Sequence, residues 1–358
     1  MSGTIEELTQ KAILLLKQLI AMPSFSSEED KTAALIEDWF TTQGISYLRH
    51  RNNVYAMNKF YDPAKPSVLL NSHHDTVKPN AAYTKDPFQA VIEDGKLFGL
   101  GSNDAGGCLV SLLALFSFFY DHSEISHNLI IVASAEEESS GPHGLNSVLP
   151  LLPPIEVAIV GEPTQMHLAI AEKGLVVFDG VVHGTPSHAA HPNGNNAIYN
   201  SIEVLKWFKE YSFEKVSETL GETKLTVTQI NAGDQHNVVP AEVNVVIDVR
   251  VNDCYSNQEI ADILIGDAPC DLKARSLRLN SSSIDRNHPL VNAGIELGRK
   301  TYGSPTLSDQ AALSCQSLKL GPGDSTRSHS ADEYIYVREI EEGIAFYIEL
   351  LTKFLLAG

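Results

Sequence analysis

The stretch Leu97–Phe116 reads LFGLGSNDAGGCLVSLLALF and joins a glycine-rich loop to a strongly apolar run. Glycines at positions 99, 101, 106 and 107 let the backbone bend sharply and approach a ligand closely. The run Cys108–Phe119 is apolar nearly all round and predicts a buried helix, with Asp104 just before its start. A charge held there needs a partner, because an isolated ion in a buried place is costly. On this stretch alone, the N-cap of a core helix is the favoured explanation of Asp104, because capping is the commoner use of Asp before a helix.

Three other apolar segments also end in acids or histidines. They are VLLN at 68–71, NLIIVAS at 128–134 and VAIVG at 157–161, which lead into SHHDTV, AEEES and EPT. Apolar strands that alternate with helices are typical of a largely parallel sheet buried on both faces. In such sheets the functional site lies at the carboxyl ends of the strands. We therefore expect these polar residues to share one edge of the sheet.

Further elements extend this pattern at both ends of the chain. Periodicity predicts a helix over 5–20, a second helix from an N-cap at Ser27 to Gly44, a strand over 54–59, a helix over 289–302, a strand over 317–320 and a helix over 338–356. Between them the order changes to β-α-β-β-α-β, with strands over 175–184, 224–230, 241–251 and 272–280 and helices over 196–211 and 258–266. That order is self-contained and predicts a ferredoxin-like unit.

The fold class is therefore α/β: a mostly parallel sheet flanked by helices, with an inserted ferredoxin-like α+β lid domain. We expect a discontinuous larger domain over 1–171 and 282–358, interrupted by the smaller domain over 172–281.

Composition limits the function classes. The chain is 43% apolar and 20% charged, with a formal net charge of −19, which argues against a nucleic-acid partner. Four cysteines, at 108, 254, 270 and 315, show no paired spacing, which favours a reducing compartment and excludes a cysteine zinc knuckle. The N-terminal segment lacks a signal-peptide pattern, and we see no apolar run long enough to span a bilayer. We expect a soluble cytoplasmic protein with no membrane partner.

Five places carry candidate metal ligands: His73 with Asp75 two residues on, Asp104, the triplet Glu136-Glu137-Glu138, Glu162, and His329. Each alone has a plain alternative, such as a structural histidine, a solvated acidic turn or a loop residue. Together at one sheet edge, two histidines and three carboxylates suit a pair of divalent ions such as zinc, bound by nitrogen and oxygen without sulfur.

A two-metal site needs one bridging group, because ions about 3.5–4 Å apart can share a carboxylate. Asp104 suits that role on its flexible loop. The outer ligands are then His73 and Glu162 on one ion, and Glu138 and His329 on the other. Glu137 is left beside the metals as a candidate general base. Asp75 could accept a hydrogen bond from the far nitrogen of His73 and fix its tautomer.

At this point the sequence resembles the dinuclear zinc amidohydrolase/peptidase family that includes acetylornithine deacetylase, succinyl-diaminopimelate desuccinylase, aminoacylase and carboxypeptidase G-like enzymes. The matching segments, in the family's order, are SHHDTV (72–77), GLGSNDAGG (99–107), SAEEESSG (134–141), GEPT (161–164), SHAAHPNGNNAI (187–198), HNVVPAE (236–242), DVR (248–250) and GPGDSTRSHSADEYI (321–335). The resemblance implies a zinc domain interrupted by a smaller lid domain that often dimerises.

The resemblance also implies a role for each matching residue. It gives His73, Asp104, Glu138, Glu162 and His329 as ligands, Glu137 as the base and Asp75 as the supporting acid. It implies a cis peptide bond at Asp104–Ala105. His188 matches a lid histidine that stabilises the developing oxyanion, often in the partner subunit's site, although a surface histidine is the plain alternative. Asn237 and Arg250 match substrate-binding lid residues, and an ion pair within a lid strand competes for Arg250.

Two departures from the family pattern affect the register. The doublet His73-His74 stands where one histidine is usual, and the spacing to Asp75 favours His73 as the ligand. Glu136 stands where the family usually has Asp before its acidic pair, and the following serines favour Glu137 as the base.

The expected activity is zinc-dependent hydrolysis of an N-acyl amino acid, with two Zn²⁺ for which Co²⁺ could substitute. The segment beginning at Gly321, which we expect to contact substrate, resembles the acetylornithine and acetyl-lysine deacetylase branch, so N-acetylornithine is the first candidate substrate, as in arginine biosynthesis. N-succinylornithine is close behind, and its succinyl group would need a cation from Lys173, Arg250 or Arg327. The alternatives are a dipeptidase or carboxypeptidase, a succinyl-diaminopimelate desuccinylase, and a non-catalytic metal-binding module. We expect a homodimer formed through the lid.

Overall fold

The computed structural model describes residues 4–356, and the chain divides into two compact units. Unit 1 contains the described residues up to Ile170, together with Ser283–Tyr302 and the described residues from Ser308 onward. Unit 2 contains Ala171–Ser282 and the short segment Gly303–Leu307. The chain therefore leaves unit 1 once for a long insertion and again for a five-residue excursion that sequence patterns did not indicate.

A nine-stranded sheet has the order β1-β2-β6-β3-β7-β17-β8-β15, with β16 paired to β8. Its strands are β1 (Tyr47–His50), β2 (Asn53–Met57), β3 (Ser67–His73), β6 (Asn128–Ser134), β7 (Val157–Val160), β8 (Leu168–Glu172), β15 (Ser282–Ser283), β16 (Thr301–Ser304) and β17 (Gln316–Lys319). The four central strands β6, β3, β7 and β17 run parallel to one another, whereas β2 is antiparallel to β6 and β8 is antiparallel to β17. The predicted mostly parallel sheet is confirmed.

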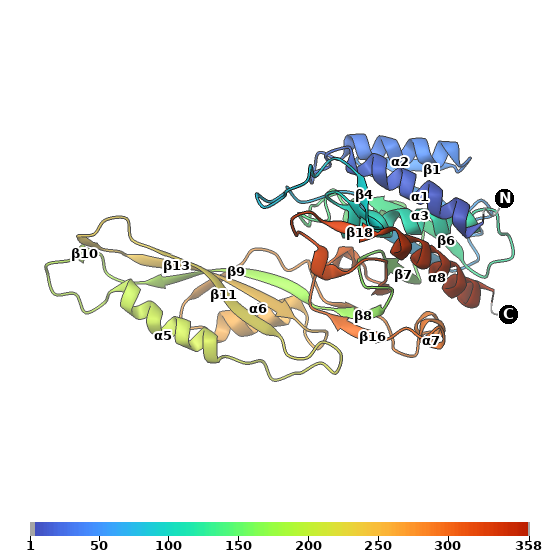
Figure 1. The fold of residues 1–358 in the computed structure, drawn as a ribbon. Helices are drawn as coiled ribbons and strands as arrows, with labels where there is room; N and C mark the ends of the chain where they lie inside the picture. The colour runs from blue at the N-terminus through green and yellow to red at the C-terminus, as the bar shows by residue number, and fades with distance from the viewer. Residues whose placement is uncertain (1–3, 357–358) are drawn as a thin grey trace. The chain divides into compact units, whose positions relative to one another are not determined.

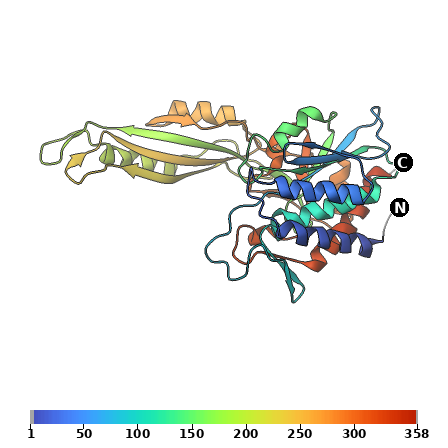
Figure 2. The same ribbon diagram turned by 90° about the horizontal axis from the view of Figure 1, so that it is seen from above.

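The central strands are buried on both faces, because neighbouring residues along β3 join different apolar clusters. Val68 and Leu70 belong to the cluster that contains the buried sides of α1 (Ile5–Ile20), α3 (Gly107–Phe119) and α8 (Val337–Leu355). Leu69 belongs to a smaller cluster with Leu145 of α4 (Leu145–Val148). Figures 1 and 2 show α1, α3 and α8 gathered on one side of unit 1.

Two helices of unit 1 are shorter than predicted. The helix α2 spans Asp30–Thr42 with Glu29 as its N-cap, so the predicted cap at Ser27 is wrong; Ser27 instead has a φ of 74° in the preceding turn. The helix α7 spans Pro289–Glu296 rather than 289–302. Gly298, with a φ of 80°, ends that segment, and the residues after it enter β16.

Unit 2 contains a four-stranded antiparallel sheet in the order β11-β13-β9-β14, which is a ferredoxin-like arrangement. Its elements are β9 (Gly174–His183), α5 (Ala197–Glu210), β11 (Lys224–Ala232), β13 (Glu242–Val251), α6 (Asn257–Asp267) and β14 (Asp271–Ala274). Strand β13 alternates buried and more exposed residues, and its buried side joins one apolar cluster with α5 and α6. Both helices cover the same face of this sheet (Figure 1). The last strand ends at Ala274, six residues before the predicted end.

The remaining elements of the two units are short. They are β4 (Val91–Glu93), β5 (Lys96–Phe98), η1 (Ser102–Gly106), η2 (Leu149–Leu151), β10 (Ser187–His188), β12 (Val238–Val239), η3 (Asp309–Ala312), η4 (Ser325–Arg327) and β18 (Tyr334–Tyr336). Strands β18, β5 and β4 form a small antiparallel sheet. It brings the start of the glycine-rich loop against the segment that follows His329.

Two expectations from composition can be compared with the structure. All four cysteines are free, as their spacing predicted. The expectation that no apolar run could span a bilayer is wrong on length and composition alone, because the helical stretch Ser102–Phe119 is long and apolar enough. That stretch is 83% buried inside the protein, so its apolar character is explained by its place in the core of unit 1.

Candidate metal centre

Asp104 lies in a sharp turn that only glycines allow. Gly101 has a φ of 75°, and a Cβ on Gly106 would lie 2.4 Å from the carbonyl oxygen of Gly101. Asp104 itself has a non-helical backbone, and its peptide bond to Ala105 is cis, as the resemblance predicted. The N-cap of α3 is Gly106. The interpretation of Asp104 as an ordinary N-cap is therefore wrong.

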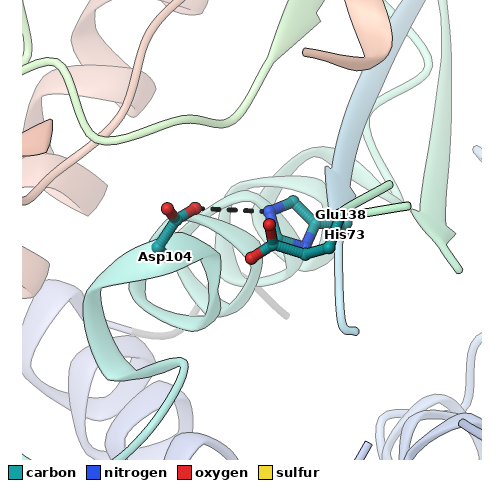
Figure 3. A group of neighbouring side chains, drawn as sticks. All are labelled: His73, Asp104 and Glu138. Carbon is teal, nitrogen blue, oxygen red and sulfur yellow. Dashed lines mark ion pairs between the residues drawn. The ribbon is translucent and has the colours of Figure 1, made fainter. Parts of the chain in front are cut away.

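His73, the last residue of β3, faces three carboxylates with one ring nitrogen. Its side chain is 1% exposed, and Nε2 lies 3.4 Å from Oδ1 of Asp104 (Figure 3). The same nitrogen lies 3.8 Å from Oε1 of Glu162 and 3.9 Å from Oε2 of Glu137. It is buried, and among the described residues it has no hydrogen-bond partner. A buried nitrogen surrounded by oxygens just beyond hydrogen-bonding distance is what a bound cation would explain.

The other ring nitrogen of His73 fixes its tautomer. Nδ1 lies 3.0 Å from the backbone oxygen of Asp75 and 3.3 Å from the Oδ1 atom of the same residue. Both oxygens only accept, so Nδ1 carries the proton. In the neutral ring Nε2 then has a free lone pair directed toward the carboxylates, as a metal ligand requires. The predicted contact between His73 and Asp75 is present, with the backbone oxygen as the closer partner.

His329 approaches the same group of carboxylates from a different segment. Its Nε2 lies 3.0 Å from Oε2 of Glu138 and 3.6 Å from Oδ2 of Asp104. The two carboxylate oxygens of Asp104 thus face different histidines. Ligand atoms of His73, Asp104 and Glu138 lie within 4.8 Å of one another, and so do those of His73, Glu137 and Glu162. The candidate ligands therefore form one compact group rather than two separated sets.

The charges of this group are crowded and buried. Burial raises the pKa of Glu137 well above its ordinary value, and the charge of Glu162 adds to the effect. Burial and the neighbouring charge of Asp104 raise the pKa of Glu162 to about 8. Burial lowers the pKa of His73, but the neighbouring carboxylates of Asp104 and Asp75 outweigh it and raise the pKa. A divalent cation relieves this repulsion between carboxylates, and nitrogen and oxygen donors without sulfur fit zinc-like ions.

His74 and Glu136, the two residues that made the assignment of ligand and base ambiguous in the sequence, contact other residues. The two ring nitrogens of His74 contact Oγ1 of Thr32 and the backbone oxygen of Asn52, each at 2.9 Å. Burial lowers the pKa of His74 to about 4, so it is a neutral structural residue. Glu136 accepts hydrogen bonds from Oγ of Ser27 and the backbone N–H of His143. Glu137 and Glu138 remain as the acidic pair that faces His73 and His329.

Sequence patterns missed a second role of Asp75. Its carboxylate accepts hydrogen bonds from the backbone N–H groups of Glu137 and Glu138, each at 3.1 Å, and from Oγ of Ser26 at 2.8 Å. Asp75 therefore holds the acidic loop as well as the histidine. No sequence signal points to these backbone contacts, because any residue type supplies an N–H.

Two of the expected substrate-binding residues belong to unit 1 and have local contacts. Gly321 packs against the site, because a Cβ there would lie 2.6 Å from both Sγ of Cys108 and the backbone oxygen of Glu162. Arg327 forms a two-pronged ion pair with Glu339, with N–O distances of 2.7 and 3.0 Å.

The other expected substrate-binding residues, and the expected oxyanion histidine, belong to unit 2. Lys173 donates to the backbone oxygen of Glu222. His188 is exposed in β10, and the backbone oxygen of Asn237 accepts from Ala189 in the paired segment. Arg250 forms an ion pair with Asp248, two residues away in β13, at 2.9 and 3.1 Å. The ion pair named as the alternative for Arg250 is thus present.

Comparison with known proteins places this geometry in a family. Peptidase family M20/M25/M40 matches residues 69–353. The chain is 29% identical to acetylornithine deacetylase of Proteus mirabilis (strain HI4320), over 96% of this chain and 97% of the relative. It is 24% identical to succinyl-diaminopimelate desuccinylase of Wolbachia pipientis subsp. Culex pipiens, over 95% and 92%.

Among solved structures, the fold is similar to the M20 family metallo-carboxypeptidase Sso-CP2 of Sulfolobus solfataricus. The TM-score is 0.75 at 15% identity, over 95% of this chain and 98% of the other. The family match covers most of the chain, including every candidate ligand in unit 1. The chain therefore belongs to peptidase family M20/M25/M40 and is a metallo-hydrolase of that family.

Proposed function

We propose that this protein removes the acyl group from an N-acyl amino acid, with N-acetylornithine as the first candidate substrate and N-succinylornithine as the second. The observation that carries the proposal is the buried Nε2 of His73, which lies 3.4–3.9 Å from the carboxylates of Asp104, Glu162 and Glu137 without a hydrogen-bond partner among the described residues. A relative that is 29% identical over nearly its whole length carries the name acetylornithine deacetylase.

The metal ligands in this proposal are the five side chains that converge in unit 1: His73, Asp104, Glu138, Glu162 and His329. They would hold two Zn²⁺, for which Co²⁺ could substitute, with Asp104 between the two histidines. When bound, such ions polarise a substrate carbonyl and lower the pKa of a water molecule toward neutrality.

Glu137 is proposed as the general base. It lies 3.9 Å from Nε2 of His73 and comes from the loop that also supplies Glu138. Its buried carboxylate has a raised pKa, which suits a group that takes a proton from water and returns it to the departing amine. His188 of unit 2 is proposed to stabilise the oxyanion that develops on the acyl carbonyl. Asn237, Arg250 and Lys173 are proposed to contact substrate.

The cellular setting is part of the proposal. Free cysteines favour a reducing compartment, so we infer a cytoplasmic enzyme that acts in arginine biosynthesis on a small molecule. The exposed face of unit 2, including Ile198, Tyr199 and Ile202, supports the proposed homodimer through this unit.

The alternative activity is hydrolysis of a peptide, as in a dipeptidase or carboxypeptidase, or of succinyl-diaminopimelate. All use the same reacting groups on a carbonyl–nitrogen bond, so unit 1 does not separate them. Membership in a family of metallo-hydrolases removes the non-catalytic binding module from consideration.

A substrate panel tests the proposal. The purified protein, loaded with Zn²⁺ or Co²⁺, is assayed for kcat/KM on N-acetylornithine, N-succinylornithine, succinyl-diaminopimelate and unblocked dipeptides. We expect the highest value for N-acetylornithine and no turnover after chelation. A higher value for dipeptides would overturn the deacylase assignment, and a metal-loaded protein that cleaves none of the four would overturn the activity itself.

A further inference from the structure

A buried carboxylate behind the candidate centre has no role in the chemistry above. Glu333 is 2% exposed and lies just before β18, four residues after His329. Its Oε1 accepts hydrogen bonds from the backbone N–H groups of Asn103 at 2.8 Å and Asp104 at 2.9 Å. Its Oε2 accepts from the N–H of Gly101 at 3.2 Å. One side chain thus holds three N–H groups of the turn that presents Asp104.

The backbone of the same residue continues this connection. The backbone oxygen of Glu333 accepts from the N–H of Gly99. The side chain of Asn103 in turn accepts from the N–H of Asp324 at 3.0 Å and donates to its backbone oxygen at 3.1 Å. The glycine-rich loop and the segment 324–333 are therefore joined at several points. Because that segment also carries His329, Glu333 fixes the position of one ligand relative to the other.

We propose that Glu333 is a positioning residue for the metal centre. By accepting hydrogen bonds from the backbone of the turn, Glu333 holds the carboxylate of Asp104 between His73 and His329. This inference rests on the metal centre of the proposed function. It extends that centre by a residue that would not contact the ions.

The physical reason is that the backbone N–H groups of this turn need hydrogen-bond acceptors. Gly101 has a left-handed conformation and Asp104 a non-helical one, so the N–H groups of this turn are not paired as in a regular helix. A buried unpaired N–H costs about 1–3 kcal/mol, and the two side-chain oxygens of Glu333 accept hydrogen bonds from three of them. Loss of the carboxylate would free the turn to move, and a bridging ligand that moves binds cations less tightly.

The neighbouring residue offers a matched control. Asp332 also accepts three hydrogen bonds, from the N–H and hydroxyl groups of Thr84 and from the N–H of Lys85. Its partners lie in the loop before β4 rather than in the turn that carries Asp104. Substitution of Asp332 therefore removes three hydrogen bonds at the preceding position in the chain without touching the turn that carries Asp104.

The test is titration of the metal-free full-length protein with Co²⁺, followed by visible absorption, for wild type, Glu333→Gln, Glu333→Ala and Asp332→Asn. We expect Glu333→Ala to weaken cobalt affinity by about 10–100-fold and to shift the absorption band at saturation, as losses of supporting groups around metals typically do. Glu333→Gln keeps one oxygen for Asn103 and Asp104 but turns an N–H toward that of Gly101, so an intermediate loss is expected. Asp332→Asn should stay within about twofold of wild type.

Wild-type cobalt affinity and an unshifted band in Glu333→Gln, together with a lower melting temperature, would overturn the inference in favour of a purely structural role. If Glu333→Ala does not fold, the cobalt affinity and absorption band of Glu333→Gln decide between the two roles. An equal loss of affinity in Asp332→Asn would also overturn it. Because cobalt binding is measured without substrate, a wild-type protein that binds cobalt but cleaves no acyl amine would refute the proposed activity and leave this inference standing.

Discussion

The two units differ in how far their charged side chains are buried. In unit 1, His73 and the carboxylates around it are buried, and burial raises the pKa values of Glu137 and Glu162. In unit 2, charged residues are largely exposed and paired with close neighbours, as in the contact of Arg275 with Asp179. Exposed pairs cost little and need no further explanation, whereas buried carboxylates without a cation are costly. The metal chemistry is therefore expected in unit 1.

The largest effect should follow from Glu137→Gln in unit 1. If Glu137 moves the proton, kcat should fall by about 10²–10⁴-fold while cobalt affinity stays close to wild type. Steady-state kinetics and cobalt titration of the same preparation measure both quantities. The adjacent Glu136→Gln is the control and should keep most of the activity, because Glu136 contacts Ser27 and His143 instead. Near-normal turnover in Glu137→Gln would remove its role as base.

The next effect should come from unit 2. His188→Ala should lower kcat by about 10²-fold, the loss typical of one oxyanion donor, without weakening cobalt binding. The matched control is His191→Ala, whose ring lies 5.7 Å from that of His188. Equal kcat values for the two variants would contradict a catalytic contribution from unit 2.

A smaller effect is expected for Arg250→Ala. If Arg250 binds the carboxylate of the substrate, KM should rise about tenfold, equivalent to about 1.4 kcal/mol, with kcat little changed. Arg275→Ala is the control, because it breaks another ion pair on the same sheet and should leave both constants unchanged. An unchanged KM for Arg250→Ala would show that Arg250 does not bind substrate and has only a structural role, in its ion pair with Asp248.

The contrast between the units also explains what sequence patterns could reveal. Apolar strands that end in polar residues predicted the parallel sheet and the edge where His73 and Glu162 meet, since side-chain type and periodicity carry that information. The predicted helix start at Ser27 and the predicted helix end at residue 302 are wrong because turns at Ser27 and Gly298 override the local preference for a helix. The order of strands and helices in unit 2 was easier to predict, apart from the early end of β14.

Supporting contacts were the least predictable part of the site. Glu333 and Asp75 both act on backbone N–H groups, which every residue but proline supplies, so no spacing of side-chain types marks their partners. The five-residue excursion Gly303–Leu307 into unit 2 could not be predicted from the sequence for a similar reason, since it is defined by contacts rather than by composition.

The central claim is that five side chains of unit 1 converge on two divalent cations with Asp104 between them. Its most direct test is a crystal structure of the cobalt-loaded protein with an anomalous difference map at the cobalt edge. We predict two peaks per chain, one beside His73 and Glu162 and one beside Glu138 and His329, with an oxygen of Asp104 bound to each. A map without peaks at these residues, or with Asp104 bound to neither ion, would contradict the claim.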